Sequence, residues 1–274
     1  MVGAEEEIIW IKRHFPPAFI LEGDLAGQGI HDRTMEILQK GLPEYRHQIV
    51  TANHPRTKKM METDANICRV GLFRNEARER TMHMSVAHIL VPPLRIYMKT
   101  SLLPSIRPIM EKDGHHCVSL ERLIRSRSDL ILGIEAERSY GGAIDEILNR
   151  YRNRTNVSVR YSSDTKGHTQ MLLRGRIDYL IEFPPIFLYG LQERQTILKD
   201  LCSLEIGESR TFQPACVGCS KTESGKTIIN RIDAILLKER KTESFRQTIE
   251  RWLDADTVRS FREAYDKAFF SQSP

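Results

Sequence analysis

An arginine-bearing segment between two apolar runs is the stretch of this sequence best suited to chemistry. The first apolar run covers Ile67 to Phe73, and a charged stretch containing Arg74, Arg78 and Arg80 separates it from a second run, Val86 to Met98. Open α/β sheets bind ligands in the crevice beyond the carboxyl ends of their strands. The planar guanidinium fork of arginine suits a carboxylate. Arg78 is therefore a candidate for binding a carboxylate, and the alternative is a solvated arginine on a surface helix.

The order of residues in this stretch matches a known pattern. Gly71 lies in the first run, Arg78 follows the short polar segment, and Ser85 comes seven residues later. This order resembles the extracellular solute-binding proteins of family 3, the periplasmic amino-acid-binding type. In those proteins the matching arginine binds the ligand carboxylate, and the chain then crosses a hinge into a second lobe. The resemblance implies that Gly71, Phe73 and Arg78 belong to a ligand site.

The loop after the first predicted strand supplies an aromatic candidate. The strand covers Ile8 to Lys12, and the proline pair Pro16-Pro17 stiffens the loop that follows it. In the resembled family an aromatic residue at this place stacks on the ligand, which makes Phe15 the candidate. The alternative is that Phe15 and Phe19 only fill the core.

A second group of candidates follows the predicted strand Leu130 to Ile134. A loop with two glycines leads from this strand into a helix predicted at Ala143 to Arg152. The first N–H groups of a helix have no partner within the helix and can bind an anion. The resemblance assigns Arg138, Ser139 and Tyr140, which lie in this loop, to holding the ligand carboxylate from the second lobe.

The strand predicted at Gly175 to Phe183 departs from the resembled pattern. In the family this strand ends in an acid that binds the ammonium group of the ligand. The matching position here is Phe183, and the acid Glu182 comes one residue earlier. Neighbouring side chains of a strand point to opposite faces. We therefore expect a carboxylate-bearing solute other than a standard free amino acid, or one whose ammonium group turns toward Glu182.

The remaining patterns predict an α/β chain of two lobes. Strands at 8–12, 45–52 and 67–73 alternate with helices at 30–41 and 55–63, which predicts a βαβαβ first lobe. Phe212 to Cys219 would cross back to that lobe, and amphipathic helices follow. The resemblance implies the type II periplasmic-binding-protein fold with two hinge strands and a ligand cleft between the lobes. Residues 1–94 and 219–274 would form a discontinuous first lobe, and residues 95–218 the second.

The cysteines allow more than one interpretation. The spacing of Cys216 and Cys219 is that of half a zinc ribbon or a redox pair, but the chain has no second such pair. His115 and His116 are expected in a loop, so neither a metal nor a cofactor is predicted. The resemblance implies that the two crossings run side by side, which would place Cys68 near Cys219. A disulfide could form there in a periplasmic protein.

The composition limits the classes of function. The chain of 274 residues is 40% hydrophobic and 28% charged, and it contains no apolar run of the ~18 residues that a membrane span needs. The formal charge is +5, but the 41 basic residues are spread among 36 acids, so a nucleic-acid partner is not indicated. No secretion signal precedes the first strand. The resemblance nevertheless places the protein in the periplasm, with its signal peptide removed.

The expected function is capture of a small, carboxylate-bearing, amino-acid-like solute for an ABC-type uptake transporter or a membrane sensor. The lobes would close on the solute by a hinge motion, and a monomer is expected. The alternative is a periplasmic enzyme on the same fold, because cyclohexadienyl dehydratases resemble these binding proteins. No catalytic group in a known motif is found, so an enzyme is not the leading interpretation.

Overall fold

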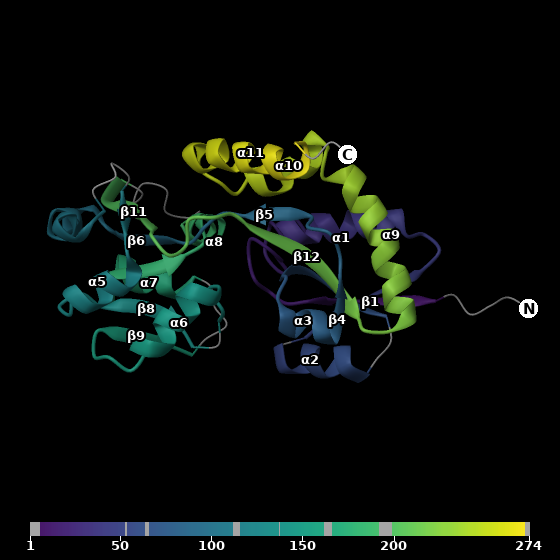
Figure 1. The fold of residues 1–274 in the computed structure, drawn as a ribbon, viewed down its shortest axis with the longest axis horizontal. Helices are drawn as coiled ribbons and strands as arrows, with labels where there is room; N and C mark the ends of the chain where they lie inside the picture. Colours follow the sequence, from purple (N-terminus) through teal and green to yellow (C-terminus); the bar gives the residue numbers. More distant parts are fainter. Residues whose placement is uncertain are drawn as a thin grey trace, which may run out of the picture. The chain divides into compact units, whose positions relative to one another are not determined.

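The computed structural model describes residues 6–52, 54–63, 66–111, 116–136, 138–161, 166–191 and 199–271. The chain divides into two compact units, which we call the first unit (1–91 and 212–274) and the second unit (92–211). Each unit is built around a six-stranded β-sheet (Figure 1). The predicted loop residue His115 lies outside the described residues.

The first unit begins with the predicted βαβαβ arrangement. Strand β1 (Glu7–Lys12) pairs in parallel with β2 (Arg46–Thr51) and β3 (Ile67–Phe73). Helices α1 (Ile30–Gly41) and α2 (His54–Thr63) connect them. In β1, Ile8, Trp10 and Ile11 are buried, so the apolar residues that predicted this strand do form part of the core.

A strand from the far end of the chain completes this sheet. Strand β12 (Gln213–Ser220) runs antiparallel between β3 and β4 (Met82–Met84), and β5 (Ile89–Val91) also pairs with it. Figure 1 shows α9 (Glu223–Glu239) running beside β12. Helices α10 (Glu243–Glu250) and α11 (Ala255–Phe269) follow. A side-chain oxygen caps the start of each of these three helices, from Thr222, Thr242 and Asp254 respectively.

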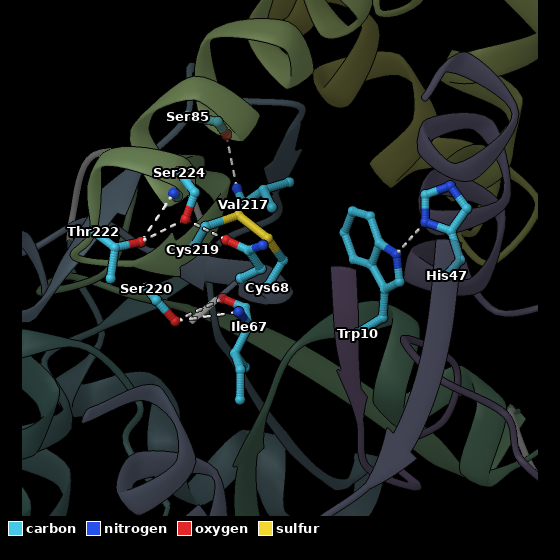
Figure 2. The surroundings of a disulfide bond; sticks show 12 residues. Trp10, His47, Ile67, Cys68, Ser85, Val217, Cys219, Ser220, Thr222 and Ser224 are labelled. Atoms are coloured by element: carbon cyan, nitrogen blue, oxygen red, sulfur yellow. Dashed lines mark hydrogen bonds between the residues drawn. A yellow bond between two sulfur atoms is a disulfide. The ribbon is translucent and has the colours of Figure 1, made fainter. Parts of the chain in front are cut away.

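A disulfide joins β3 to β12 in this sheet. Cys68 and Cys219 are directly opposite in the antiparallel ladder, with their Cα atoms 4.1 Å apart, and their sulfur atoms are bonded. Figure 2 shows the bond beside Trp10, whose Nε1 donates to His47 Nδ1 at 3.0 Å. The Ile67 N–H donates to Ser220 Oγ at 3.2 Å next to it. The bond therefore ties together two strands that are remote in sequence.

The sheet of the second unit has the strand order β7-β11-β6-β10-β8-β9. Parallel pairs join β8 (Leu132–Glu135) to β9 (Val157–Arg160) and to β10 (Tyr179–Glu182). Strand β6 (Arg95–Lys99) is antiparallel to both β10 and β11 (Leu201–Ile206), and β7 (Cys117–Val118) is at the edge. The helices are α4 (Leu103–Ile106), between the 3-10 turns Thr100–Leu102 and Arg107–Ile109, and α5 (Leu120–Ser126), α6 (Gly142–Tyr151), α7 (Gly167–Leu173) and α8 (Pro184–Gly190).

The charged segment that follows β3 is partly helical. It contains a short helix, α3 (Glu76–Thr81), and Arg78 is part of it. Asn75 caps this helix by accepting a hydrogen bond from the Arg78 N–H at 2.9 Å, and Glu76 and Glu79 favour its start. The apolar run that follows is also divided, because β5 ends before Pro92-Pro93 and β6 begins after it.

No helix within the described ranges combines the length and the apolar character that crossing a membrane requires.

Candidate ligand-binding site

Arg78 lies against the carboxyl end of β3. Its guanidinium donates a hydrogen bond to the Phe73 carbonyl oxygen at the last residue of that strand. The side chain is partly buried, and this burial lowers the pKa of Arg78. The group is therefore a preorganised cation at the strand end where the sequence placed the carboxylate-binding arginine.

A further arginine, Arg69 within β3, was missed by the sequence analysis. Arg69 lies between the buried residues Cys68 and Val70, on the amino-terminal side of Gly71. Burial and the positive charges of Arg13 and Arg78 lower the pKa of Arg69 to about 10. We call these three residues, Arg13, Arg69 and Arg78, the arginine cluster. A charged residue in an otherwise apolar strand was the signal that could have identified Arg69.

Phe15 lies beside the arginine cluster. The Arg13 guanidinium is 5.1 Å from the centre of the Phe15 ring, a cation–π distance. Two backbone hydrogen bonds of 3.0 Å link Phe15 and Phe19 and close the loop between them. Phe19 is buried whereas Phe15 is only partly covered. Of the two phenylalanines, Phe19 is thus the core residue.

Gly71 accommodates a histidine ring. It has φ of +83°, and its strand neighbours Val70 and Leu72 pair with Val217 and Cys216, so Gly71 forms a bulge. A Cβ atom on Gly71 would lie 2.2 Å from Nε2 of His31. Only glycine leaves room for this ring. The predicted site residue Gly71 therefore also has a packing role.

Two buried histidines were not predicted. The His31 ring lies 5.5 Å from the His88 ring and 5.4 Å from the Phe19 ring, measured between ring centres. Burial lowers the pKa of His31 to about 4, with a smaller lowering by Arg69 and an opposing effect of Asp32. Burial also holds the pKa of His88 well below its usual value. Both rings are neutral at pH 7.

In the second unit, Arg138 forms an ion pair with Glu182. Two guanidinium nitrogens of Arg138 donate to the two carboxylate oxygens of Glu182, and the side chains are 13% and 9% exposed. Burial opposes the charge on Arg138, but the Glu182 carboxylate outweighs it and raises the pKa of Arg138. The guanidinium also lies 4.8 Å from the Tyr140 ring and 5.6 Å from the Phe183 ring. The structure thus brings the predicted site residues Arg138, Tyr140 and Glu182 together, and the charges of Arg138 and Glu182 neutralise each other.

Ser139 and Tyr140 lie at the start of α6. The Ser139 hydroxyl donates to Asp145 Oδ2 at 2.6 Å, and the Tyr140 N–H donates to Asp145 Oδ1 at 2.7 Å. The sequence analysis expected the backbone N–H groups before this helix to be available for a ligand. The Tyr140 N–H is not available, because it already donates to the Asp145 carboxylate. A cavity of about 290 Å³ adjoins the loop and is lined by Arg138, Ser139, Tyr140, Asp145 and Arg152, among others.

The zinc or redox interpretation of Cys216 and Cys219 is not supported. Cys219 is bonded to Cys68, and Cys216 is buried with a free thiol whose pKa is raised by burial. Among the residues that the structure describes, no three histidine, cysteine or acidic side chains are grouped so that they could hold a metal ion.

No family model matches the sequence, and the comparison with curated proteins finds no match. The fold is nevertheless similar to many solved structures. An ancestral cationic amino acid solute-binding protein matches with 13% identity and a TM-score of 0.64, over 91% of this chain and 96% of its own. Substrate-binding domain 2 of GlnP from Lactococcus lactis has 15% identity and a TM-score of 0.59, with 93% and 98% covered. A histidine kinase sensor domain similar to periplasmic binding proteins has 14% identity and a TM-score of 0.62, with 90% and 96% covered.

At these identities the likeness establishes the fold. The structures found are amino-acid-binding proteins and a related sensor domain, so the resemblance predicted from Gly71, Arg78 and Ser85 is confirmed at that level. The predicted α/β class is confirmed by the two mixed sheets and their helices. The chain therefore has the two-lobed fold of the periplasmic binding proteins.

Proposed function

We propose that the protein captures a small carboxylate-bearing solute, as a periplasmic solute-binding protein of family 3. The two lobes predicted from the sequence would close on the solute by a hinge motion. The observation that carries the proposal is the arginine cluster of the first unit, in which Arg78 lies at the carboxyl end of β3. Such a concentration of guanidinium groups favours an anion.

The solute is not a standard free amino acid under this proposal. An amino acid needs an acid for its ammonium group, and the acid nearest to the expected position, Glu182, is already paired with Arg138. Phe183, at the expected position itself, is buried and apolar. Because an uncompensated ammonium group is costly to desolvate, a cationic or zwitterionic solute is disfavoured. Phe15, Phe73, Ser139 and Tyr140 complete the proposed site.

The partner is an ABC-type transporter or a membrane sensor. One similar structure is the substrate-binding protein of an amino acid ABC transporter, and another is the histidine kinase sensor domain. We further propose that the protein is located in the periplasm and is a monomer. It would need no cofactor and would bind no nucleic acid.

An enzyme on this fold is the alternative class. One similar structure is described as a precursor of cyclohexadienyl dehydratase. The clearest acid and base pair in the second unit is Glu135 and His168, with Nδ1 3.2 Å from the carboxylate, but His168 Nε2 is buried. A substrate cannot reach a buried nitrogen without a rearrangement, so binding without turnover is the proposed activity. An assay with prephenate at high protein concentration checks this.

Isothermal titration with amino acids and simple organic acids tests the proposed site. Arg78→Ala should weaken binding by roughly 30-fold or more, because a bidentate and partly desolvated guanidinium contact contributes a few kcal/mol. Arg80→Ala is the matched control, since Arg80 lies on the same helix with its side chain 74% exposed. Tight binding of an amino acid that neither Arg78→Ala nor Glu182→Gln affects would contradict the site.

A further inference from the structure

We propose that the outer face of α5 and α6 in the second unit is a docking surface for an acidic segment of a partner protein. Four arginines form this surface, which we call the arginine face: Arg122, Arg125, Arg150 and Arg154. That the partner is the transporter or sensor rests on the proposed function. The binding of an acidic segment does not rest on it.

The fold brings the two pairs of arginines together from separate parts of the sequence. Helices α5 and α6 pack against each other. Glu121 joins them on the outside, because its Oε1 accepts from the Arg150 guanidinium at 2.8 Å and from the Tyr151 hydroxyl at 2.7 Å. The Arg154 guanidinium lies 5.9 Å from the centre of the Tyr151 ring. Through these contacts Arg150 and Arg154 lie beside α5. The apolar residues of both helices point inward, and the buried ones are Leu120, Leu123, Ile124, Ile144, Ile147 and Leu148.

The arginine face has an excess of positive charge. Arg122 and Arg125 are three residues apart on α5, so they share one side of the helix. Neither side chain forms an ion pair or a hydrogen bond within the described ranges. The acids of the same surface are Glu121, which Arg150 already pairs with, and Glu146, one turn before Arg150 on α6. Four arginines against these two acids leave two positive charges uncompensated.

The surface around Arg122 and Arg125 is hollowed. A hollow of about 440 Å³ is lined by both arginines together with Ser119, Glu121 and Ser126. Guanidinium groups at its rim can bind carboxylates in the bidentate way that is strongest for arginine. Arginine and tyrosine are also the residue types that most often dominate the energy of protein interfaces. The hollow therefore suits protruding carboxylate side chains.

An acidic protein segment fits this face better than a small anion or a membrane. A phosphate ion in the hollow would meet the Glu121 carboxylate, which lines it as well. The arginines also lie on two helices, so they match several carboxylates in series. None of the large apolar side chains that are exposed in the described chain belongs to α5 or α6, so this face has no apolar group to insert into a lipid layer.

Fluorescence anisotropy with a labelled acidic peptide tests the inference. The probe is a short peptide of alternating Glu and Gly, and the reference peptide alternates Gln and Gly. The proteins are wild type, the double variant Arg122→Gln with Arg125→Gln, and the control double variant Arg46→Gln with Arg80→Gln. The control removes two exposed arginines of the first unit, whose side chains are 71% and 74% exposed. Both double variants therefore have the same net charge.

The wild type should bind the Glu peptide and not the Gln peptide, and salt should weaken this binding. Arg122→Gln with Arg125→Gln should weaken it at least about 5-fold, because two charge-assisted contacts are lost. The control double variant should weaken it less than about 2-fold. Arg122→Lys with Arg125→Lys keeps both charges and should lie between the wild type and the Gln double variant.

Three results would overturn the inference. The first is no binding of the Glu peptide, and the second is an equal loss in both double variants, which would show an effect of net charge alone. The third is a different ligand on the same arginines. Inorganic phosphate and vesicles of phosphatidylcholine with phosphatidylglycerol are the probes for it. Binding of either one that needs Arg122 and Arg125, without binding of the Glu peptide, would assign the face to phosphate or lipid.

The outcomes for this face and for the proposed function are separate. Arg78→Ala should leave the affinity for the Glu peptide unchanged. If the peptide binds as expected but no solute binds, or Arg78→Ala does not weaken solute binding, the proposed function fails and the docking surface stands without its transporter or sensor. If the peptide does not bind, the docking surface fails and the solute titrations decide the proposed function alone.

Discussion

Arg138 and Glu182 face each other across the end of β10 in the second unit, joined by two parallel hydrogen bonds. A third hydrogen bond, from the Phe183 N–H to Glu182 Oε1 at 2.7 Å, holds the carboxylate in place. The acid that a ligand ammonium group would need is thus oriented by its neighbours. Under the proposed function, this pair would contribute both to the stability of the second unit and to the choice of solute.

Removing one partner of this pair should destabilise the protein. Glu182→Gln removes the carboxylate charge that the buried Arg138 guanidinium pairs with, and we expect a loss of roughly 3 kcal/mol in the free energy of unfolding. Urea denaturation followed by circular dichroism measures the loss. The double variant Arg138→Met with Glu182→Leu should lose less free energy of unfolding than Arg138→Met and Glu182→Leu lose together as single variants. Additive losses would show that the pair contributes no coupling energy.

Gly71 should not tolerate a side chain. Gly71→Ala places a methyl group against the His31 ring, 2.2 Å from Nε2, and forces alanine into a positive φ. The positive φ alone costs about 1 to 2 kcal/mol, so a total of at least about 2 kcal/mol is expected. Gly142→Ala is the control, because a Cβ there meets no atom within 4 Å. Equal thermal midpoints for the two variants would contradict this account of Gly71.

The protein should lose stability in mild acid. The unfolded chain protonates His31 near pH 6.5, whereas the folded chain keeps it neutral down to about pH 4. Between these values the unfolded state binds more protons, so the free energy of unfolding falls as the pH falls. His31 alone should account for about 2 kcal/mol between pH 7 and pH 4.5, since one pKa unit corresponds to about 1.4 kcal/mol.

Urea denaturation at both pH values checks the role of His31. The loss on acidification should be about 2 kcal/mol smaller in His31→Gln than in the wild type. The same substitution at His14, whose side chain is 38% exposed, is the control. An unchanged loss in His31→Gln would exclude His31 as a source of the pH dependence.

The disulfide between Cys68 and Cys219 should be a main contributor to stability. It closes a loop with a sequence separation of 151 residues, and native disulfides typically contribute about 2 to 5 kcal/mol. Because Cys117 and Cys216 are buried, alkylation is carried out on the urea-denatured protein without reductant, and it should label three thiols, on Cys117, Cys202 and Cys216. Dithiothreitol should lower the thermal midpoint of the wild type but not that of Cys68→Ala with Cys219→Ala. Labelling of all five cysteines would exclude the bond in the isolated protein.

Local patterns predicted the regular elements of this fold well. The predicted helix Ile30 to Gly41 and the predicted strand Ile67 to Phe73 have the same bounds in the structure, because periodicity and a terminal glycine are local signals. A helix around Arg78 was only the alternative interpretation of the sequence, because the six-residue α3 buries no residue and is too short to show a period. Its capping residue, Asn75, was the only strong signal of its start.

The arrangement of the site depended on contacts that the sequence does not show. Glu182 and Arg138 are 44 residues apart, and they meet because β10 pairs in parallel with β8. The alternation argument treated Glu182 and Phe183 as neighbours within one strand, but β10 ends at Glu182 and the Arg138 guanidinium lies near both side chains. It could not identify the partner of Glu182. Arg69 was overlooked because its strand was treated as uniformly apolar, although a charge at an alternate position indicates a special environment.

The position of β12 also determines the order in which the chain can fold while it is synthesised. Strand β12 is the central partner of β3 and β4, yet it leaves the ribosome only after every strand of the second unit. Until then β3 has an open edge, which is a template for wrong pairing. The sheet of the second unit contains only strands from residues 95–206 and needs nothing from later residues. Nascent chains should therefore complete the second unit first, and the first unit should depend on chaperones for longer.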